Sequence, residues 1–209
     1  QGELIPVDAD GVVDTASFDQ MLGAAKAPAL VSVMFANNET GVIQPVADIA
    51  EIAHAHGALF HCDAVQAAGR LSLDELSGAD LISLSAHKLG GPMGVGALIV
   101  RHDSLKAQIV GGGQERGRRA GTENGPGIAG FGTATELANN HEKYTEITTL
   151  RDSLEARVIA YGATIFGNGA ARISNTTCIS MPGVAAETQV IAFDLDGIAI
   201  SAGAACSSG

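Results

Sequence analysis

The chain has few basic residues, and this scarcity limits what it can bind. Its 209 residues include 12 Lys and Arg against 23 Asp and Glu, which gives a formal net charge of -11 at pH 7. Nucleic acids and anionic membranes are bound through basic surfaces, so this balance argues against both as partners. No apolar run reaches the length needed to span a membrane. An anionic ligand would therefore need a local site.

Cysteine is also scarce, and this argues against a disulfide framework. The three cysteines, Cys62, Cys178 and Cys206, are odd in number and far apart, as is typical of proteins from a reducing compartment. We therefore expect a cytoplasmic protein, but the first residue is glutamine, and an upstream organellar targeting segment stays open. We expect no metal site, because the cluster of candidate ligands is divided between a helix end and a strand: His54, His56, His61 and Cys62.

Strand and helix patterns alternate along a hydrophobic, glycine-rich chain. Hydrophobic residues make up 46% of it, with 27 glycines. We predict strands over residues 30–35, 58–62, 80–85, 94–101, 173–181 and 198–201, and helices over 46–56, 128–159 and 187–195. This order indicates an α/β fold with a mostly parallel sheet and flanking helices. We place a domain boundary near residue 145, between a large domain (1–144) and a smaller α+β domain (145–209), and expect the chain to be an internal fragment.

Lys88 stands where a predicted buried strand gives way to a glycine loop. It follows Ser85 and His87 and precedes the glycines at 90 and 91. An amine partly withdrawn from water can become neutral enough to attack a carbonyl carbon. Most lysines at strand ends, however, are solvated surface cations. Lys88 is therefore a candidate Schiff-base lysine that needs support from other residues.

Polar residues also follow the two preceding strands. Residues 37–41 follow the first, Asp63 and Gln66 follow the second, and Ser85 and His87 follow the third. Because parallel strands end at one edge of a sheet, we expect all three groups to face one crevice. Each group alone has an ordinary explanation as a turn former, a helix cap or a polar residue of a first helical turn. Those explanations do not predict that the groups converge.

The chemistry of this set fits a pyridine aldehyde phosphate. Such a cofactor needs a lysine for its aldehyde, a carboxylate beside the ring nitrogen, and neutral donors for its phenolic oxygen and its phosphate. These groups are supplied in turn by Lys88, Asp63, Gln66, Ser85 and His87. The glycines after Lys88 form neither a P-loop nor a dinucleotide fingerprint, so nucleotide binding is discounted.

Motifs spread in order along the chain resemble the cysteine desulfurases of the class V aminotransferase, fold-type I pyridoxal-phosphate family. They are Asn-Asn-Glu-Thr-Gly at 37–41, His-Cys-Asp-Ala-Val-Gln at 61–66 and Ser-Ala-His-Lys at 85–88. The glycine- and arginine-rich segment 111–124 strengthens the match. The resemblance implies a fold-type I transferase that uses pyridoxal 5'-phosphate and forms a homodimer.

The same resemblance implies a role for each residue of the set. Lys88 would carry the cofactor, and Asp63 would pair with the ring nitrogen. The contacts to the ring oxygen would come from Asn38 and Gln66, and those to the phosphate from Ser85 and His87. Thr122 would reach the phosphate of the cofactor in the neighbouring subunit.

Cys206 lies in a run of small residues with no apolar side chains to bury it, which favours a reactive thiol. Cys178 and Cys62 fit buried strand positions better. The run resembles the loop of desulfurases that serve iron-sulfur assembly and nitrogenase maturation. The resemblance implies that Cys206 takes the sulfur of L-cysteine as a persulfide and leaves L-alanine, with Lys88 or His87 handling protons. The sulfur would then pass to an acceptor or iron-sulfur scaffold protein.

Two other functions stay open at this point. A selenocysteine lyase or a class V aminotransferase would share Lys88 and Asp63 but would not need Cys206, and a non-catalytic partner protein would keep the fold without the activity. The resemblance also implies that a ring-stacking histidine, an upstream phosphate contact and a substrate-binding arginine lie outside the chain. We therefore expect the chain alone to be inactive.

Overall fold

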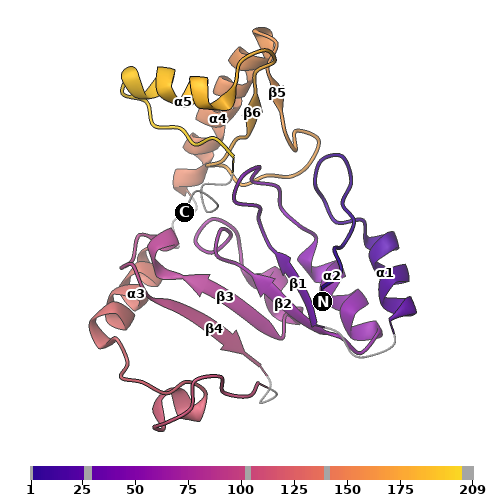
Figure 1. Cartoon of the computed structure of the whole chain (residues 1–209), viewed down its shortest axis with the longest axis vertical. Helices are drawn as coiled ribbons and strands as arrows, with labels where there is room; N and C mark the ends of the chain where they lie inside the picture. Colours follow the sequence, from indigo (N-terminus) through magenta and orange to yellow (C-terminus); the bar gives the residue numbers. More distant parts are fainter. Residues whose placement is uncertain (1, 26–29, 102–104, 139–141, 204–209) are drawn as a thin grey trace. The chain divides into compact units, whose positions relative to one another are not determined.

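The chain folds into two compact units (Figure 1). The computed structural model describes residues 2–25, 30–101, 105–138 and 142–203. The sheet unit consists of residues 15–35 and 45–140, and the terminal unit consists of residues 1–14, 36–44 and 141–209. Two N-terminal segments thus group with the C-terminal part of the chain. The predicted domains, 1–144 and 145–209, stay a prediction.

The sheet unit is built on four strands in the order β1 (Leu30–Met34), β2 (Leu59–Asp63), β3 (Leu81–Ser85) and β4 (Gly96–Val100). The first three are parallel, as predicted, with Met34 beside Asp63 and Asp63 beside Ser83. The fourth is antiparallel to β3, which leaves the sheet mostly parallel, as predicted. The connection between Ser85 and Gly96 is too short for a parallel crossover, which takes roughly a dozen residues or more.

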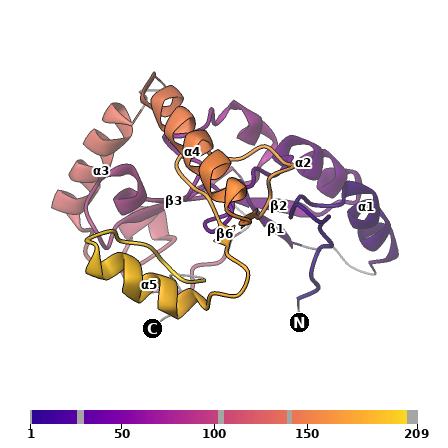
Figure 2. The ribbon, with the colours of Figure 1, turned by 90° about the horizontal axis from the view of Figure 1, so that it is seen from above.

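Helices and short 3-10 turns flank this sheet. The order is α1 (Thr15–Ala24), α2 (Val46–Ala55), η1 (Asp74–Gly78), η2 (Ala86–Leu89), η3 (Gln114–Gly117) and α3 (Gly125–Leu137). α2 packs on β2 and α1 packs on α2, as Figures 1 and 2 both show. Among the described residues, no helix is long and apolar enough to cross a membrane.

The core of this unit follows from the apolar spacing of α2. Val46, Ile49, Ala50 and Ala53 recur at helical intervals and are all buried. They face a sheet surface on which Phe60 and Cys62 are fully buried. The fold prediction of a mostly parallel sheet with flanking helices is confirmed. The sequence pattern missed α1, whose Phe18 also enters the core.

The single long helix predicted over residues 128–159 is wrong, because two helices occupy this stretch. α3 begins earlier, at Gly125, and ends at Leu137, and α4 (Glu142–Ala160) follows. The Asn124 side chain accepts a hydrogen bond from the Gly127 N–H, and Pro126 lies in the first turn. Both are known helix-start signals, which the hydrophobic periodicity alone did not use.

The terminal unit contains α4, β5 (Thr164–Ile165), β6 (Ile179–Ser180) and α5 (Ala186–Leu195). β5 and β6 form a two-stranded antiparallel sheet. Of the strand predicted over 173–181 only residues 179–180 form a strand (β6), and no strand forms over 198–201. The helix predicted over 187–195 is confirmed by α5.

Candidate functional site

The first part of the candidate site lies at the carboxyl end of β2. Asp63 is the last residue of the strand, and its Oδ1 accepts a hydrogen bond from the Val65 N–H at 2.9 Å. Ala64 N–H donates to the Ser83 carbonyl at 3.0 Å, which ties this strand end to β3. No described residue donates a hydrogen bond to the other carboxylate oxygen, Oδ2. Asp63 therefore acts as a turn cap and still offers one acceptor.

The second part lies at the end of β3, in the parallel strand beside it. Ser85 ends this strand, and η2 carries His87 and Lys88 within one helical turn. The Ser85 hydroxyl and His87 Nδ1 form a hydrogen bond at 2.9 Å. The two side chains predicted to hold a phosphate are therefore in contact with each other.

Lys88 itself is half-buried, and its amine makes no hydrogen bond or ion pair with any described residue. Gln66, also half-buried, lies in the turn that follows Asp63, and its side chain likewise bonds to none of the described residues. One carboxylate, one amide, one amine and one hydroxyl–imidazole pair thus lie at the ends of two adjacent parallel strands. This donor set fits a pyridine aldehyde phosphate.

His61 was not singled out as a functional residue, yet it links three strands of the sheet. Its Nδ1 bonds the Ser32 hydroxyl and its Nε2 bonds the Ser83 hydroxyl, both at 2.8 Å. His61 shares a face with Asp63, two residues on, whereas Cys62 points to the buried side, as predicted. The alternation of side chains along a strand places His61 and Asp63 on the same face, and this signal could have marked His61 as part of the site.

The described histidines near Cys62 each have a separate partner. His54 bonds Asp80 at 2.9 Å, and His56 bonds Asp19 at 2.7 Å. Among the described residues, no group of three or more histidines, cysteines or carboxylates is placed to hold a metal ion.

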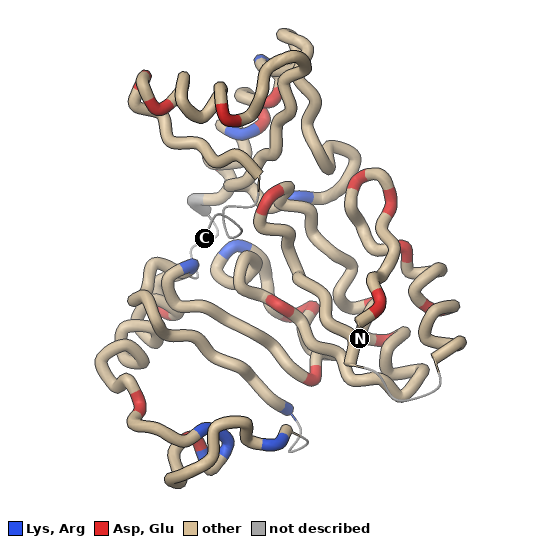
Figure 3. Tube along the Cα trace, viewed as in Figure 1, with Lys and Arg blue, Asp and Glu red and all other residues tan. Residues whose placement is uncertain are grey.

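The remaining predicted site residues lie elsewhere in the described chain. Thr122 is exposed in the segment between β4 and α3, where Figure 3 shows several basic residues. Asn38 is exposed and belongs to the terminal unit. It sits in a turn capped by Asn37, whose Oδ1 accepts hydrogen bonds from the Glu39 and Thr40 N–H groups. The roles proposed for Asn38 and Thr122 stay predictions, and Cys206 lies outside the described residues.

The two described cysteines are poor nucleophiles. Burial raises the pKa of the Cys62 thiol to about 12, and the nearby Asp63 charge adds to this rise. Burial also raises the pKa of the half-buried Cys178 thiol, with a smaller contribution from Glu39. The thiolate role expected of Cys206 stays a prediction.

A cavity of about 400 Å³ lies in the terminal unit, and none of the described site residues lines it. Its lining includes Arg151, Asp152, Glu155 and Arg172. These charges satisfy each other or backbone carbonyls: Arg172 pairs with Glu155, and Arg151 bonds Asp152 and the Ile173 carbonyl. The cavity therefore offers structural ion pairs and no free charge for a ligand.

The fold and the strand-end residues together define an α/β protein with a candidate site for an aldehyde cofactor. The chain belongs to the aminotransferase class V family, whose model matches residues 3–208. This family depends in general on pyridoxal phosphate.

Within this family, the chain is similar to proteins named as cysteine desulfurases. The chain is 47% identical to a cysteine desulfurase of Cereibacter sphaeroides and 45% identical to one of Klebsiella pneumoniae, each over 98% of this chain. Among solved structures, a NifS-like protein from Rickettsia africae superposes with a TM-score of 0.90 at 39% identity, covering 96% of this chain and 57% of that one. SspA, solved in complex with cysteine, gives 0.77 at 30% identity, covering 99% of this chain and 58% of SspA. The chain spans 53% and 52% of the lengths of the two desulfurases.

Proposed function

We propose that the full-length protein is a pyridoxal-phosphate-dependent cysteine desulfurase, which converts L-cysteine to L-alanine and transfers the sulfur to one of its own cysteines. The observation that carries this proposal is the arrangement of Asp63 and Lys88 at the ends of adjacent parallel strands, in a chain 47% identical to a cysteine desulfurase. Membership of the class V family supports pyridoxal phosphate as the cofactor, and the relatives' names support cysteine desulfuration as the reaction.

In this proposal the bound cofactor supplies an electron sink conjugated to the substrate α-carbon. Lys88 holds the cofactor through its amine, which no described residue engages. Asp63 keeps the ring nitrogen protonated through its unoccupied carboxylate oxygen. Gln66 and Asn38 orient the ring through its phenolic oxygen.

The phosphate is assigned to Ser85 and His87, whose mutual hydrogen bond at 2.9 Å places a hydroxyl and an imidazole together. Thr122 is assigned to the phosphate of the neighbouring subunit, which makes the active protein a homodimer. Lys88, or alternatively His87, moves the proton at the substrate α-carbon.

Sulfur transfer is assigned to the Cys206 thiolate. Its attack on the substrate sulfur forms an S–S bond while the Cβ–S bond of L-cysteine breaks. The bonding pair stays with carbon, which takes up a proton to become the methyl group of L-alanine, and the sulfur remains as a persulfide. Because the sulfur must then leave, we assign its delivery to an acceptor or scaffold protein of iron-sulfur cluster or thio-cofactor synthesis in the cytoplasm.

The test uses the full-length protein with Lys88→Ala and Cys206→Ala. We expect Lys88→Ala to abolish the absorbance of the lysine-bound cofactor, and Cys206→Ala to keep that absorbance while sulfide release falls by several orders of magnitude. Full sulfide release by Cys206→Ala would overturn the desulfurase proposal and favour a lyase of the selenocysteine lyase type, whereas an aminotransferase would release no sulfide from L-cysteine. A wild type that bound cofactor but formed no alanine would instead be a non-catalytic partner protein.

A further inference from the structure

Arg70 connects the two loops of the sheet unit that carry the candidate site. Its Nη1 donates to the Gln66 carbonyl at 2.8 Å, and its Nη2 donates to the Lys88 carbonyl at 3.2 Å. The side chain is half-buried, so these bonds form partly out of water. One planar guanidinium therefore bridges the backbones of two residues assigned to the cofactor.

The two loops also pack directly against each other, at Gly69 and Leu89. Gly69 adopts a φ of +74°, and a Cβ added there would lie 2.7 Å from Leu89 Cδ2. A glycine thus permits the turn after Asp63 to approach the lysine turn more closely than a side chain would allow. This contact is independent of the Arg70 hydrogen bonds and joins the same two loops.

The bond to Lys88 matters because η2 is only one turn long. The last carbonyls of a helix have no partner within it, and a single 3-10 turn has little else to fix its geometry. Here the Gly91 N–H donates a hydrogen bond to the Ala86 carbonyl at 2.9 Å, and the Arg70 guanidinium donates one to the Lys88 carbonyl. The backbone that aims the Lys88 side chain is therefore held by Arg70.

The other end of the bridge leads back to Asp63. Gln66 lies in a helical turn in which the Ala67 and Ala68 N–H groups both donate to the Ala64 carbonyl, and the Val65 N–H donates to Asp63 Oδ1. The guanidinium thus fixes the lysine turn against the turn that Asp63 caps. Lysine could not replace it, because one ammonium on a flexible stem lacks the planar fork that reaches both carbonyls.

We propose that Arg70 is a positioning residue that sets the direction of the Lys88 amine relative to the Asp63 carboxylate. This inference rests on the proposed function, because it assumes that Lys88 carries the cofactor. Arg70 touches neither substrate nor cofactor in this role and acts through the backbone of Lys88.

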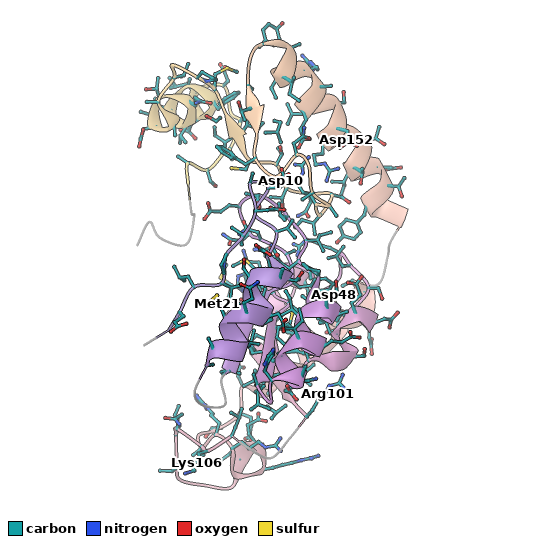
Figure 4. All side chains as sticks on the ribbon, turned by 90° about the vertical axis from the view of Figure 1, so that its right-hand side faces the viewer. Asp10, Met21, Asp48, Arg101, Lys106 and Asp152 are labelled. Atoms are coloured by element: carbon teal, nitrogen blue, oxygen red, sulfur yellow. The ribbon has the colours of Figure 1, made fainter. Side chains whose placement is uncertain are left out.

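The test uses the full-length protein with bound pyridoxal phosphate and the variants Arg70→Met and Arg70→Lys. The matched control is Arg101→Met, because Arg101 also donates to a backbone carbonyl, that of Leu76 at 3.4 Å, but lies past the far end of β4 (Figure 4). The measurements are the pH midpoint of the absorbance change of the lysine-bound cofactor, and kcat and KM for L-cysteine.

We expect Arg70→Met to shift the pH midpoint and to lower kcat by about 10- to 100-fold with little change in KM, since small misplacements of a reacting group cost this much. Arg70→Lys should give an intermediate loss and keeps the test valid if the methionine variant does not fold. Arg101→Met should keep the wild-type midpoint and kcat.

The inference is overturned if folded Arg70 variants keep the wild-type pH midpoint and kcat while Lys88→Ala abolishes the lysine-bound absorbance. The proposed function would then stand without it. Retention of that absorbance in Lys88→Ala would instead remove the proposed function, and the inference with it.

Discussion

Among the described residues of the terminal unit, Glu155 and Arg172 form the most enclosed ion pair. Two hydrogen bonds of 2.7 Å join the carboxylate to the guanidinium, and the two side chains are 7% and 5% exposed. The Arg172 hydrogen bond lowers the pKa of Glu155 below its ordinary value of 4.5, although burial opposes this. The pair joins α4 to the segment before Ile173, which is itself buried in the core.

We expect Glu155→Gln to lower the free energy of unfolding by about 3–5 kcal/mol, because it leaves a buried guanidinium without its counter-charge. Asp152→Asn is the matched control on the same helix: Asp152 pairs with Arg151 but is 57% exposed, so its loss should cost less than about 1 kcal/mol. Denaturant unfolding of the full-length protein measures both. Equal effects of the two substitutions would contradict the importance of the buried pair.

The same pair predicts a pH dependence. Because the folded-state pKa of Glu155 is lowered, its stabilising contribution is complete above 4.5 and is lost as the pH falls below that value through the folded-state pKa. The wild type should therefore lose more stability than Glu155→Gln in this acidic window. Parallel losses for the two proteins in acid unfolding curves would show that another carboxylate is responsible.

Cys62 should resist alkylation in the native protein. With a pKa of about 12, only about one thiol in 10⁵ is ionised at pH 7, and the side chain is fully buried. Iodoacetamide labelling followed by peptide mass mapping should leave Cys62 unmodified until the protein is unfolded in guanidinium. Equal labelling rates in the native and unfolded states would contradict its place in the core.

At the scale of elements, the contact between the Asp63 turn and the lysine turn depends on a glycine. Gly69 and Gly57 have similar positive φ values, +74° and +70°, but a Cβ at Gly69 would meet Leu89 Cδ2 and, at 3.0 Å, Ala138 Cβ, whereas a Cβ at Gly57 would meet nothing within 4 Å. The two positions therefore separate backbone strain from crowding.

We expect Gly57→Ala to cost about 1 kcal/mol from the left-handed backbone alone. Gly69→Ala should cost about 1–3 kcal/mol more, because the added methyl group overpacks the interface between the loops. Unfolding midpoints of the two variants in the full-length protein give the comparison. A Gly69→Ala variant no less stable than Gly57→Ala would mean that the loops can separate without cost.

The sequence predicted several elements whose signals are local. The strands that end at Asp63 and Ser85 were bounded to within a residue or so, because short apolar runs end at polar turns, and so was α2, which starts after a proline and ends before a glycine. The antiparallel direction of β4 and the start of α3 were missed although both have local signals, namely the short connection after Ser85 and the Asn124 cap with Pro126. Arg70 was missed for a different reason: side-chain bonds to backbone carbonyls leave no sequence motif.

At the scale of the whole molecule, the sheet that carries the candidate site is covered unequally. One face carries Phe60 and Cys62, which are fully buried, and α2 packs against β2, although Ile99 of β4 on the same face is 45% exposed. The other face carries Asp63 together with Leu30, Met34 and Leu98, which are 60%, 40% and 51% exposed. Parallel sheets are normally buried on both faces, so these exposed apolar residues mark a surface that the 209 residues leave partly uncovered.

We therefore expect the 209-residue chain alone to form alanine from L-cysteine at least about 100-fold more slowly than the full-length protein when both are supplied with pyridoxal phosphate. Catalytic sites exclude water and hold the reacting groups rigidly, whereas the Asp63 face of the sheet is only partly buried in this chain. Alanine is quantified after incubation with L-cysteine, and circular dichroism with limited proteolysis checks that the chain is folded. A folded chain that matched the full-length rate would show that its 209 residues suffice for catalysis although this face of the sheet is only partly buried.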